Sequence, residues 1–191
     1  MKNIFLTLIL LSFFDVSCKA QHIIPIENTH NYIGSNAGYM GNHDYVYVKD
    51  INSILPKFLG TWKGHMGSST FEFVISKRTT DDGELKQDEL LMRYKITDVN
   101  SNVIENTLSL PNDSPFVLKN GYIAETGSYV FSYIGRNNKC GQNGWVFFNQ
   151  TKNTTNKAKL FLSVQGESYP ICDTGPAEQI LPLDWIELTK Q

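Results

Sequence analysis

From Asp44 onward, apolar side chains recur at every second residue, and this period restricts the fold more than any other feature of the chain. The clearest case is 89–96, where the apolar set is Leu90, Met92, Tyr94 and Ile96. Such a pattern predicts strands with one buried face and one solvated face. Helical periodicity after Asp44 is limited to a short stretch at 54–59, where Pro56 suits the first turn.

Further short runs predict strands at 45–48, 61–64, 71–75, 102–108, 115–119, 121–125, 128–134, 144–149, 158–165 and 180–189. Turn-forming residues separate these runs, and Asn120-Gly121 is the strongest hairpin signal among them. Short strands at close spacing are typical of antiparallel sandwiches and barrels. We therefore predict an all-β fold, a single antiparallel β-barrel of about 8–10 strands with one short helix before the first barrel strand.

The N-terminus has the organisation of a secretory signal. A single cation, Lys2, precedes an apolar run over 4–14, and small residues follow that run. The run is about half of the roughly 20 residues that a membrane-spanning helix needs, so we expect this segment to be removed. The sequence therefore predicts export, either to the periplasm or outer membrane of the cell envelope as a lipoprotein or as a secreted or periplasmic protein.

Two cleavage sites fit this signal. Ser17-Cys18 matches the end of a bacterial lipoprotein signal, whose cleavage would remove 1–17 and leave Cys18 acylated at the new N-terminus. Asp15 stands where such signals usually carry Leu, and ordinary cleavage after Ala20 is the alternative. Lipidation of Cys18 is the favoured interpretation, and the acyl anchor would be the only attachment to the membrane.

Residues 18–43 become rich in Asn, Gly and Ser and are predicted to be a tether, with a folded β-barrel domain over 44–191. The competing interpretation of this stretch is a first strand pinned by Ile23, Ile24 and Ile26. The chain has 17 basic and 19 acidic residues and a net charge of −2. Because these charges are scattered and form no basic stripe, we expect no nucleic-acid partner.

Besides Cys18, the chain has two cysteines, Cys140 and Cys172, and each stands close to a glycine-containing turn. An even number of cysteines in an exported domain indicates a disulfide, and two free thiols are the alternative. The spacing matches no metal motif, because there is neither a Cys-x-x-Cys pair nor a nearby His. We expect no metal and no cofactor.

Aromatic residues gather on two predicted strands, Tyr129, Phe131 and Tyr133 on one and Trp145 and Phe147 on the other. Each set shares one face of its strand, because side chains two residues apart point the same way. Their simplest role is to fill the core. The functional alternative is that all five line an apolar pocket inside a barrel too wide to be filled, where a small apolar ligand would bind.

The motif Gly60-Thr61-Trp62-Lys63-Gly64, directly after the predicted short helix, resembles the opening of calycin barrels. In lipocalins and fatty-acid-binding proteins, a Gly-x-Trp on the first strand follows a short helix and closes one end of the barrel. The resemblance implies a calycin-like, lipocalin-like barrel in which Trp62 is structural and closes the barrel. A strand in an unrelated sheet is the alternative context for the same short motif.

A second resemblance covers nearly the whole chain. It rests on the start at 1–4, the junction at 17–21 and motifs that follow in order at 58–64, 93–98, 110–116, 140–144 and 180–182. Together these resemble a family of small exported proteins from flavobacteria and their relatives, described only as a domain of unknown function. The resemblance implies export and supplies no catalytic residue.

No catalytic motif is present, since the chain lacks a Gly-x-Ser-x-Gly elbow, a His-Glu-x-x-His pair and a phosphate-binding loop. His43-Asp44 comes closest to a dyad, but a solvated loop explains it better than catalysis. The leading hypothesis is a non-enzymatic exported lipoprotein whose β-barrel binds a small apolar ligand. The alternative is a structural or interaction protein of the envelope that binds a protein partner through its outer surface.

Overall fold

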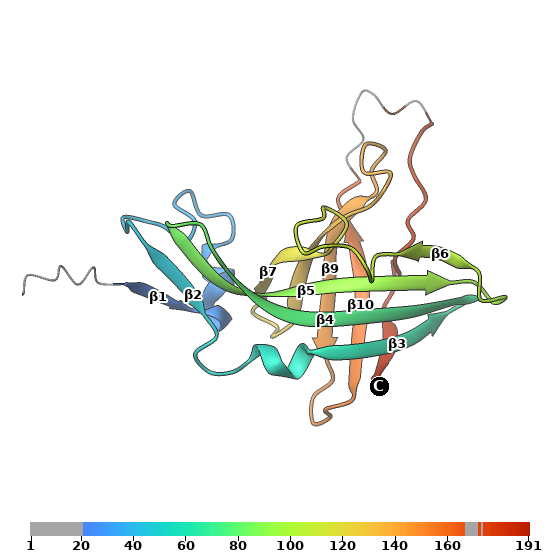
Figure 1. Cartoon of the computed structure of the whole chain (residues 1–191), viewed down its shortest axis with the longest axis horizontal. Coiled ribbons are helices and arrows are strands. Elements are labelled where there is room, and N and C mark those ends of the chain that lie inside the picture. Colours follow the sequence, from blue (N-terminus) through green and yellow to red (C-terminus); the bar gives the residue numbers. More distant parts are fainter. Residues whose placement is uncertain (1–20, 167–171, 173) are drawn as a thin grey trace, which may run out of the picture.

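The computed structural model describes residues 21–166, 172 and 174–191, which form eleven strands and two short 3-10 helices (Figure 1). In chain order the elements are β1 (His22–Pro25), η2 (Ile26–Tyr32), β2 (Val46–Lys49), η3 (Leu55–Phe58), β3 (Gly60–Met66), β4 (Ser69–Asp81), β5 (Leu85–Thr97), β6 (Val103–Asn106), β7 (Lys119–Ile123), β8 (Tyr129–Ile134), β9 (Asn143–Gln150), β10 (Lys157–Val164) and β11 (Ile186–Lys190). Most of the strands predicted from alternation are confirmed. Among these described residues, no helix has the length and apolar character needed to cross a membrane.

The strands form one open, mixed sheet, so the prediction of a single closed, antiparallel, calycin-like barrel is wrong. The strand order is β1-β2-β5-β4-β3-β11-β10-β9-β8-β7, and β6 also pairs with β5. β2 runs parallel to both of its neighbours, β1 and β5, whereas the other pairs are antiparallel. β1 and β7 are the two ends of this order, and the hydrogen-bonded ladder does not continue from one to the other.

The edge of β5 that faces away from β4 is shared by three short segments. β2 pairs with β5 at 85–87, and β6 pairs with it at 95–97. Between these positions β5 meets the segment before β7 at a single isolated bridge, where Met92 and Leu118 exchange backbone hydrogen bonds of 2.9 and 3.0 Å. β7 therefore does not form a continuous ladder along β5, which a closed barrel requires.

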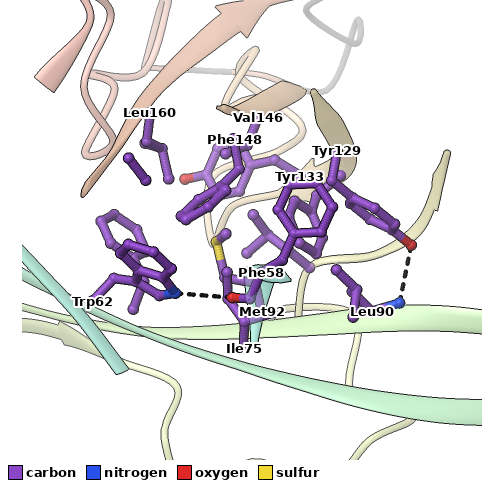
Figure 2. Packing of buried hydrophobic residues seen from close by; sticks show 14 of the residues in the cluster. Phe58, Trp62, Ile75, Leu90, Met92, Tyr129, Tyr133, Val146, Phe148 and Leu160 are labelled. Carbon is purple, nitrogen blue, oxygen red and sulfur yellow. Dashed lines mark hydrogen bonds between the residues drawn. The ribbon is translucent and has the colours of Figure 1, made fainter. Parts of the chain in front are cut away.

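The hydrophobic core lies between two parts of this sheet, because β9 and β10 run across β3, β4 and β5 (Figure 1). Figure 2 shows Phe58, Trp62 and Phe148 within it. The Trp62 Nε1–H donates to the Phe58 carbonyl at 2.8 Å, and the Trp62 ring meets Phe148 edge-on with centroids 5.2 Å apart. Trp62 is fully buried, so it acts as a core residue and not as the closure of a barrel end.

The N-terminal elements are part of the folded domain. β1 pairs with β2, and Ile24 and Ile26 are buried in the core. η2 is attached to β7, where the backbone N–H of Ile123 donates to Thr29 Oγ1 at 3.0 Å. The tether expected over 18–43 therefore does not describe β1 and η2, and the competing interpretation of a pinned first strand accounts for them.

The hairpin predicted at Asn120-Gly121 is wrong, because both residues lie inside β7. The register of β7 against β8 shifts between Lys119 and Tyr122. Asn120 has a left-handed backbone with φ of 53°, and its N–H donates to the buried Glu89 carboxylate at 3.0 Å. The Asn-Gly pair thus lies where β7 has one residue more than β8, and the positive φ of Asn120 is a conformation that a tight hairpin turn also uses.

The predicted disulfide between Cys140 and Cys172 is confirmed, with the two Cα atoms 5.1 Å apart. It joins the β8–β9 connection to a residue 32 positions further along the chain, before β11. The same connection is held by the backbone N–H of Ala177, which donates to the Cys140 carbonyl at 2.8 Å. Disulfides of this kind are typical of proteins from oxidising compartments.

Replacing both Cys140 and Cys172 with serine is expected to lower the free energy of unfolding by about 3 kcal/mol, because the unfolded chain regains the freedom of a long closed loop. Equilibrium urea unfolding measures this loss. Reduced wild-type protein is the matched control and should lose a similar amount. A double variant as stable as the oxidised wild type would contradict the expectation.

Candidate functional site on the outer face of the sheet

The five aromatic residues predicted to line a pocket lie on opposite faces of the sheet. Tyr129, Phe131 and Tyr133 point from β8 into the core and are buried. Trp145 and Phe147 point from β9 to the outside, because the alternate residues of β9 take the core-facing positions. The set therefore does not surround one space, and its first three members have the core role.

The buried tyrosines are structural. The Tyr129 hydroxyl accepts a hydrogen bond from the backbone N–H of Leu90 at 2.9 Å, which joins β8 to β5 (Figure 2). Burial raises the pKa of Tyr129, and it also raises the pKa of Tyr94 and of Tyr133. These phenols stay protonated at neutral pH, whereas an acid–base catalyst needs a pKa near the working pH.

Five aromatic side chains meet on the outside of the C-terminal half of the sheet. They come from β7, β9, β10 and the segment before β11, and we call them the outer aromatic face: Tyr122, Trp145, Phe147, Phe161 and Trp185. Ring centroids lie 6.3 Å apart for Tyr122–Trp145, 5.0 Å for Phe147–Phe161 and 4.3 Å for Phe161–Trp185. Trp145 and Phe147 share one face of β9 and so connect the two groups.

Strand pairing brings these rings together. Phe147 lies opposite Phe161 of β10 on one side and opposite Val130 of β8 on the other. Val130 points outward as well, yet it is fully buried between Phe147 and Tyr122 in the register. Cross-strand aromatic and β-branched pairs of this kind each stabilise a sheet by roughly 0.2–1 kcal/mol.

The outer aromatic face is only partly covered within the described residues. Four of its members are half-buried, whereas Trp185 is 49% exposed and nearby Leu183 is 53% exposed. Lys159 and Glu187 face each other at its border, with 3.7 Å between Nζ and Oε1. An apolar centre with a charged border is the organisation of a protein interface.

The sequence pattern of β10 marks Phe161 as a member of this face. In β10 the core-facing positions hold Ala158, Leu160 and Leu162, yet Phe161 occupies the outward phase between them. A large ring at a phase that should be polar indicates a covered or binding surface. Tyr122 and Trp185 belong to the face because of the order of the strands and the course of the chain before β11. Neither of these can be predicted from a local sequence pattern.

A shallow polar groove of about 240 Å3 lies on the outer side of β3, β4 and β5. Its lining residues are Lys63, Thr70, Glu72, Lys95, Thr97 and Ser101. Lys63 and Glu72 form an ion pair at 3.4 Å, and Lys95 lies opposite Glu72 in the sheet. Exposed pairs such as these contribute little energy, and the opposite charges leave the groove without a strong preference for an anion or a cation.

Buried charges form a network between β2, β4 and β5. Asp88 accepts hydrogen bonds from Thr79 Oγ1 at 2.6 Å and from the Asp50 N–H at 3.1 Å, and Lys77 Nζ lies 3.3 Å away. Burial alone would raise the pKa of Asp88, but these hydrogen bonds and the Lys77 ammonium more than offset it and hold the pKa below its usual range. An ionised, fully hydrogen-bonded carboxylate fixes strands together and is not suited to proton transfer.

The histidines do not assemble a catalytic or metal site within the described part of the chain. His43, which sequence placed beside Asp44 in a weak dyad, stacks on His22 with ring centroids 3.8 Å apart. No group of three or more His, Cys, Asp or Glu side chains suited to a metal ion occurs among the described residues. Cys18, the predicted acylation site, lies outside them.

Comparison with known proteins supplies a family but no activity. No curated protein and no solved structure matches the chain. A model for a family of unknown function matches residues 1–163, which include the elements from β1 to β9 and nearly all of β10. The chain therefore belongs to the family of unknown function DUF6705.

Proposed function

We propose that this protein is a non-enzymatic exported lipoprotein, acylated at Cys18, that binds a protein partner of the cell envelope through the outer aromatic face. The observation that carries the proposal is the contiguous set of five rings on the outside of the sheet. The aromatic residues of β8 fill the core and the sheet is open, so the hypothesis of an apolar ligand inside a closed barrel loses its basis.

Export is supported by two separate observations. The Cys140–Cys172 disulfide is the kind of bond that persists outside the reducing cytosol. The apolar run over 4–14 and the Ser17-Cys18 junction support a lipoprotein signal. Two or more acyl chains on Cys18 would hold the domain stably at a membrane, whereas one chain binds only marginally.

A protein partner fits the outer aromatic face better than a charged ligand does. Trp and Tyr are enriched among the residues that dominate binding energy at protein interfaces. The border formed by Lys159 and Glu187 carries both signs of charge, which suits a partner with complementary polar groups. The centre of the face offers no cluster of like charge to recruit an ion.

Mass spectrometry of the mature protein from the membrane fraction tests the lipoprotein assignment. The expected N-terminus is Cys18 carrying acyl chains. A mature N-terminus at Gln21 without lipid would contradict the assignment. That result would leave partner binding through the outer aromatic face to be judged by its own test.

Replacing Trp185 with serine is expected to weaken partner binding at least about tenfold, because exposed aromatic anchors dominate interface energy. Native mass spectrometry of the protein purified from its own envelope measures the fraction in complex at several concentrations. The matched control is Val99→Ser, which changes a residue that is 75% exposed in the β5–β6 turn. Equal losses for the two variants, or no loss for Trp185→Ser, would contradict the proposed surface.

A further inference from the structure

The short connection between Cys18 and the first strand limits how far the domain can lie from its anchor. β1 begins at His22, and its four residues are paired with β2. Only residues 19–21 separate Cys18 from β1. An extended chain spans at most about 3.6 Å per residue, so the Cα atoms of Cys18 and His22 lie within about 14 Å of each other.

We propose that, once Cys18 is acylated, the β1 end of the domain lies against the surface of the bilayer. This inference rests on the lipoprotein assignment proposed above. Acyl chains hold the residue that carries them at the membrane interface. The interfacial region of each leaflet is about 5–8 Å thick, so a span of about 14 Å leaves β1 close to the headgroups. The domain then lies on the membrane, whereas a flexible tether of about 25 residues would have held it away from the membrane.

The surface at this end fits a neutral bilayer better than an anionic one. Val46 pairs with His22 in β1 and with Leu85 in β5, so the β4–β5 turn belongs to the same end of the sheet. That turn, 81–84, contains three acidic residues, which anionic headgroups repel. Ile23 is 41% exposed and offers an apolar contact. The contact with the bilayer therefore depends on the acyl anchor and responds little to salt.

The opposite end of the molecule supplies the control position. Figure 1 shows β1 and the β5–β6 turn at opposite ends of the long axis. Val99 lies in that turn and is highly exposed. A label at Val99 therefore reports a part of the domain that the proposal places away from the membrane.

The test is quenching of a thiol-linked fluorophore by brominated phospholipid. Full-length Ile23→Cys and Val99→Cys proteins are expressed with their own signal, purified in the acylated form and placed in vesicles of neutral phospholipid. Cys140 and Cys172 do not react with the label, because they form a disulfide, and acylation blocks the Cys18 thiol. Insertion of a flexible 20-residue Gly/Ser linker between Gln21 and His22 of both labelled proteins gives a second pair, in which the domain gains a reach of about 25 Å.

We expect several-fold stronger quenching at position 23 than at position 99, and we expect the inserted linker to reduce the difference. Acylated protein that is quenched equally at both positions would overturn the inference and leave the lipoprotein assignment intact. Stronger quenching at position 99 would overturn it as well. A mature protein without acyl chains overturns the lipoprotein assignment and this inference together, and the mass of the purified protein distinguishes that case.

Discussion

Replacing Trp62 with alanine is expected to lower the free energy of unfolding by about 3–5 kcal/mol, the range for large aromatic residues removed from a core. The Trp62 ring is fully buried, and it packs edge-on against Phe148. Its Nε1–H satisfies the Phe58 carbonyl at the end of η3. The substitution therefore leaves a cavity and an unpaired buried carbonyl at the same place.

Trp185→Ala is the matched control for this prediction, since it removes the same side chain from the surface. Trp185 is about half exposed and contacts Phe161 with centroids 4.3 Å apart. One aromatic pair contributes about 0.5–1.5 kcal/mol, so we expect a loss of about 1 kcal/mol. Urea unfolding of both variants gives the comparison. A smaller loss for Trp62→Ala than for Trp185→Ala would contradict the placement of Trp62 in the core.

Replacing Asp88 with alanine is expected to lower the free energy of unfolding by about 3–4 kcal/mol, because partners of the buried carboxylate lose their hydrogen bonds together. The Thr79 hydroxyl, the Asp50 N–H and the Lys77 ammonium all point to Asp88. Asp184→Ala, at an exposed position, is the control and should change stability by no more than about 0.5 kcal/mol. Similar stabilities for Asp88→Ala and Asp184→Ala would contradict a structural role for the network.

Acidic pH is expected to reproduce part of the loss of stability caused by Asp88→Ala. Because the pKa of Asp88 is depressed in the folded protein, the stabilisation is complete above the unfolded-state value of about 4 and is lost as the pH falls through the lower folded-state pKa. Asp88→Asn cannot titrate, so its stability should fall less than that of wild type between neutral pH and strongly acidic pH. Unfolding curves collected across this range measure the difference. Parallel losses in the two proteins would show that Asp88 contributes nothing to acid sensitivity.

The sequence is sufficient to predict where most strands lie, but it does not show whether the sheet closes into a barrel or stays open. Alternation is a local property, and it identified β5, β8, β9 and β10 to within a few residues. Whether β7 continues the ladder along β5 depends on which other strands pair with the same edge of β5. β6 follows β5 after a short turn, but β2 pairs with that edge from a distant position in the chain. Asn120-Gly121 shows the same limit, since a positive φ serves a bulge as well as a hairpin.

The site was predicted only in part for a related reason. The sequence predicts Trp145 and Phe147 as functional candidates, but a period of two does not show which face of β9 meets the core when both phases are apolar. Their partners Phe161 and Trp185 come from β10 and from the chain before β11, and only strand order places them alongside. The predicted tether extends too far because Ile24 is buried in β1, which pairs with β2 across a long loop, and Ile26 is buried at the start of η2.

Site-specific photocrosslinking in the native envelope tests whether the outer aromatic face binds a protein partner. A photoreactive amino acid replaces Trp185 in one protein and Val103, an exposed residue of β6, in the other. We expect a discrete adduct of higher mass with a protein from position 185 and none from position 103. Adducts from position 103 alone, or none from position 185 in correctly exported protein, would contradict it.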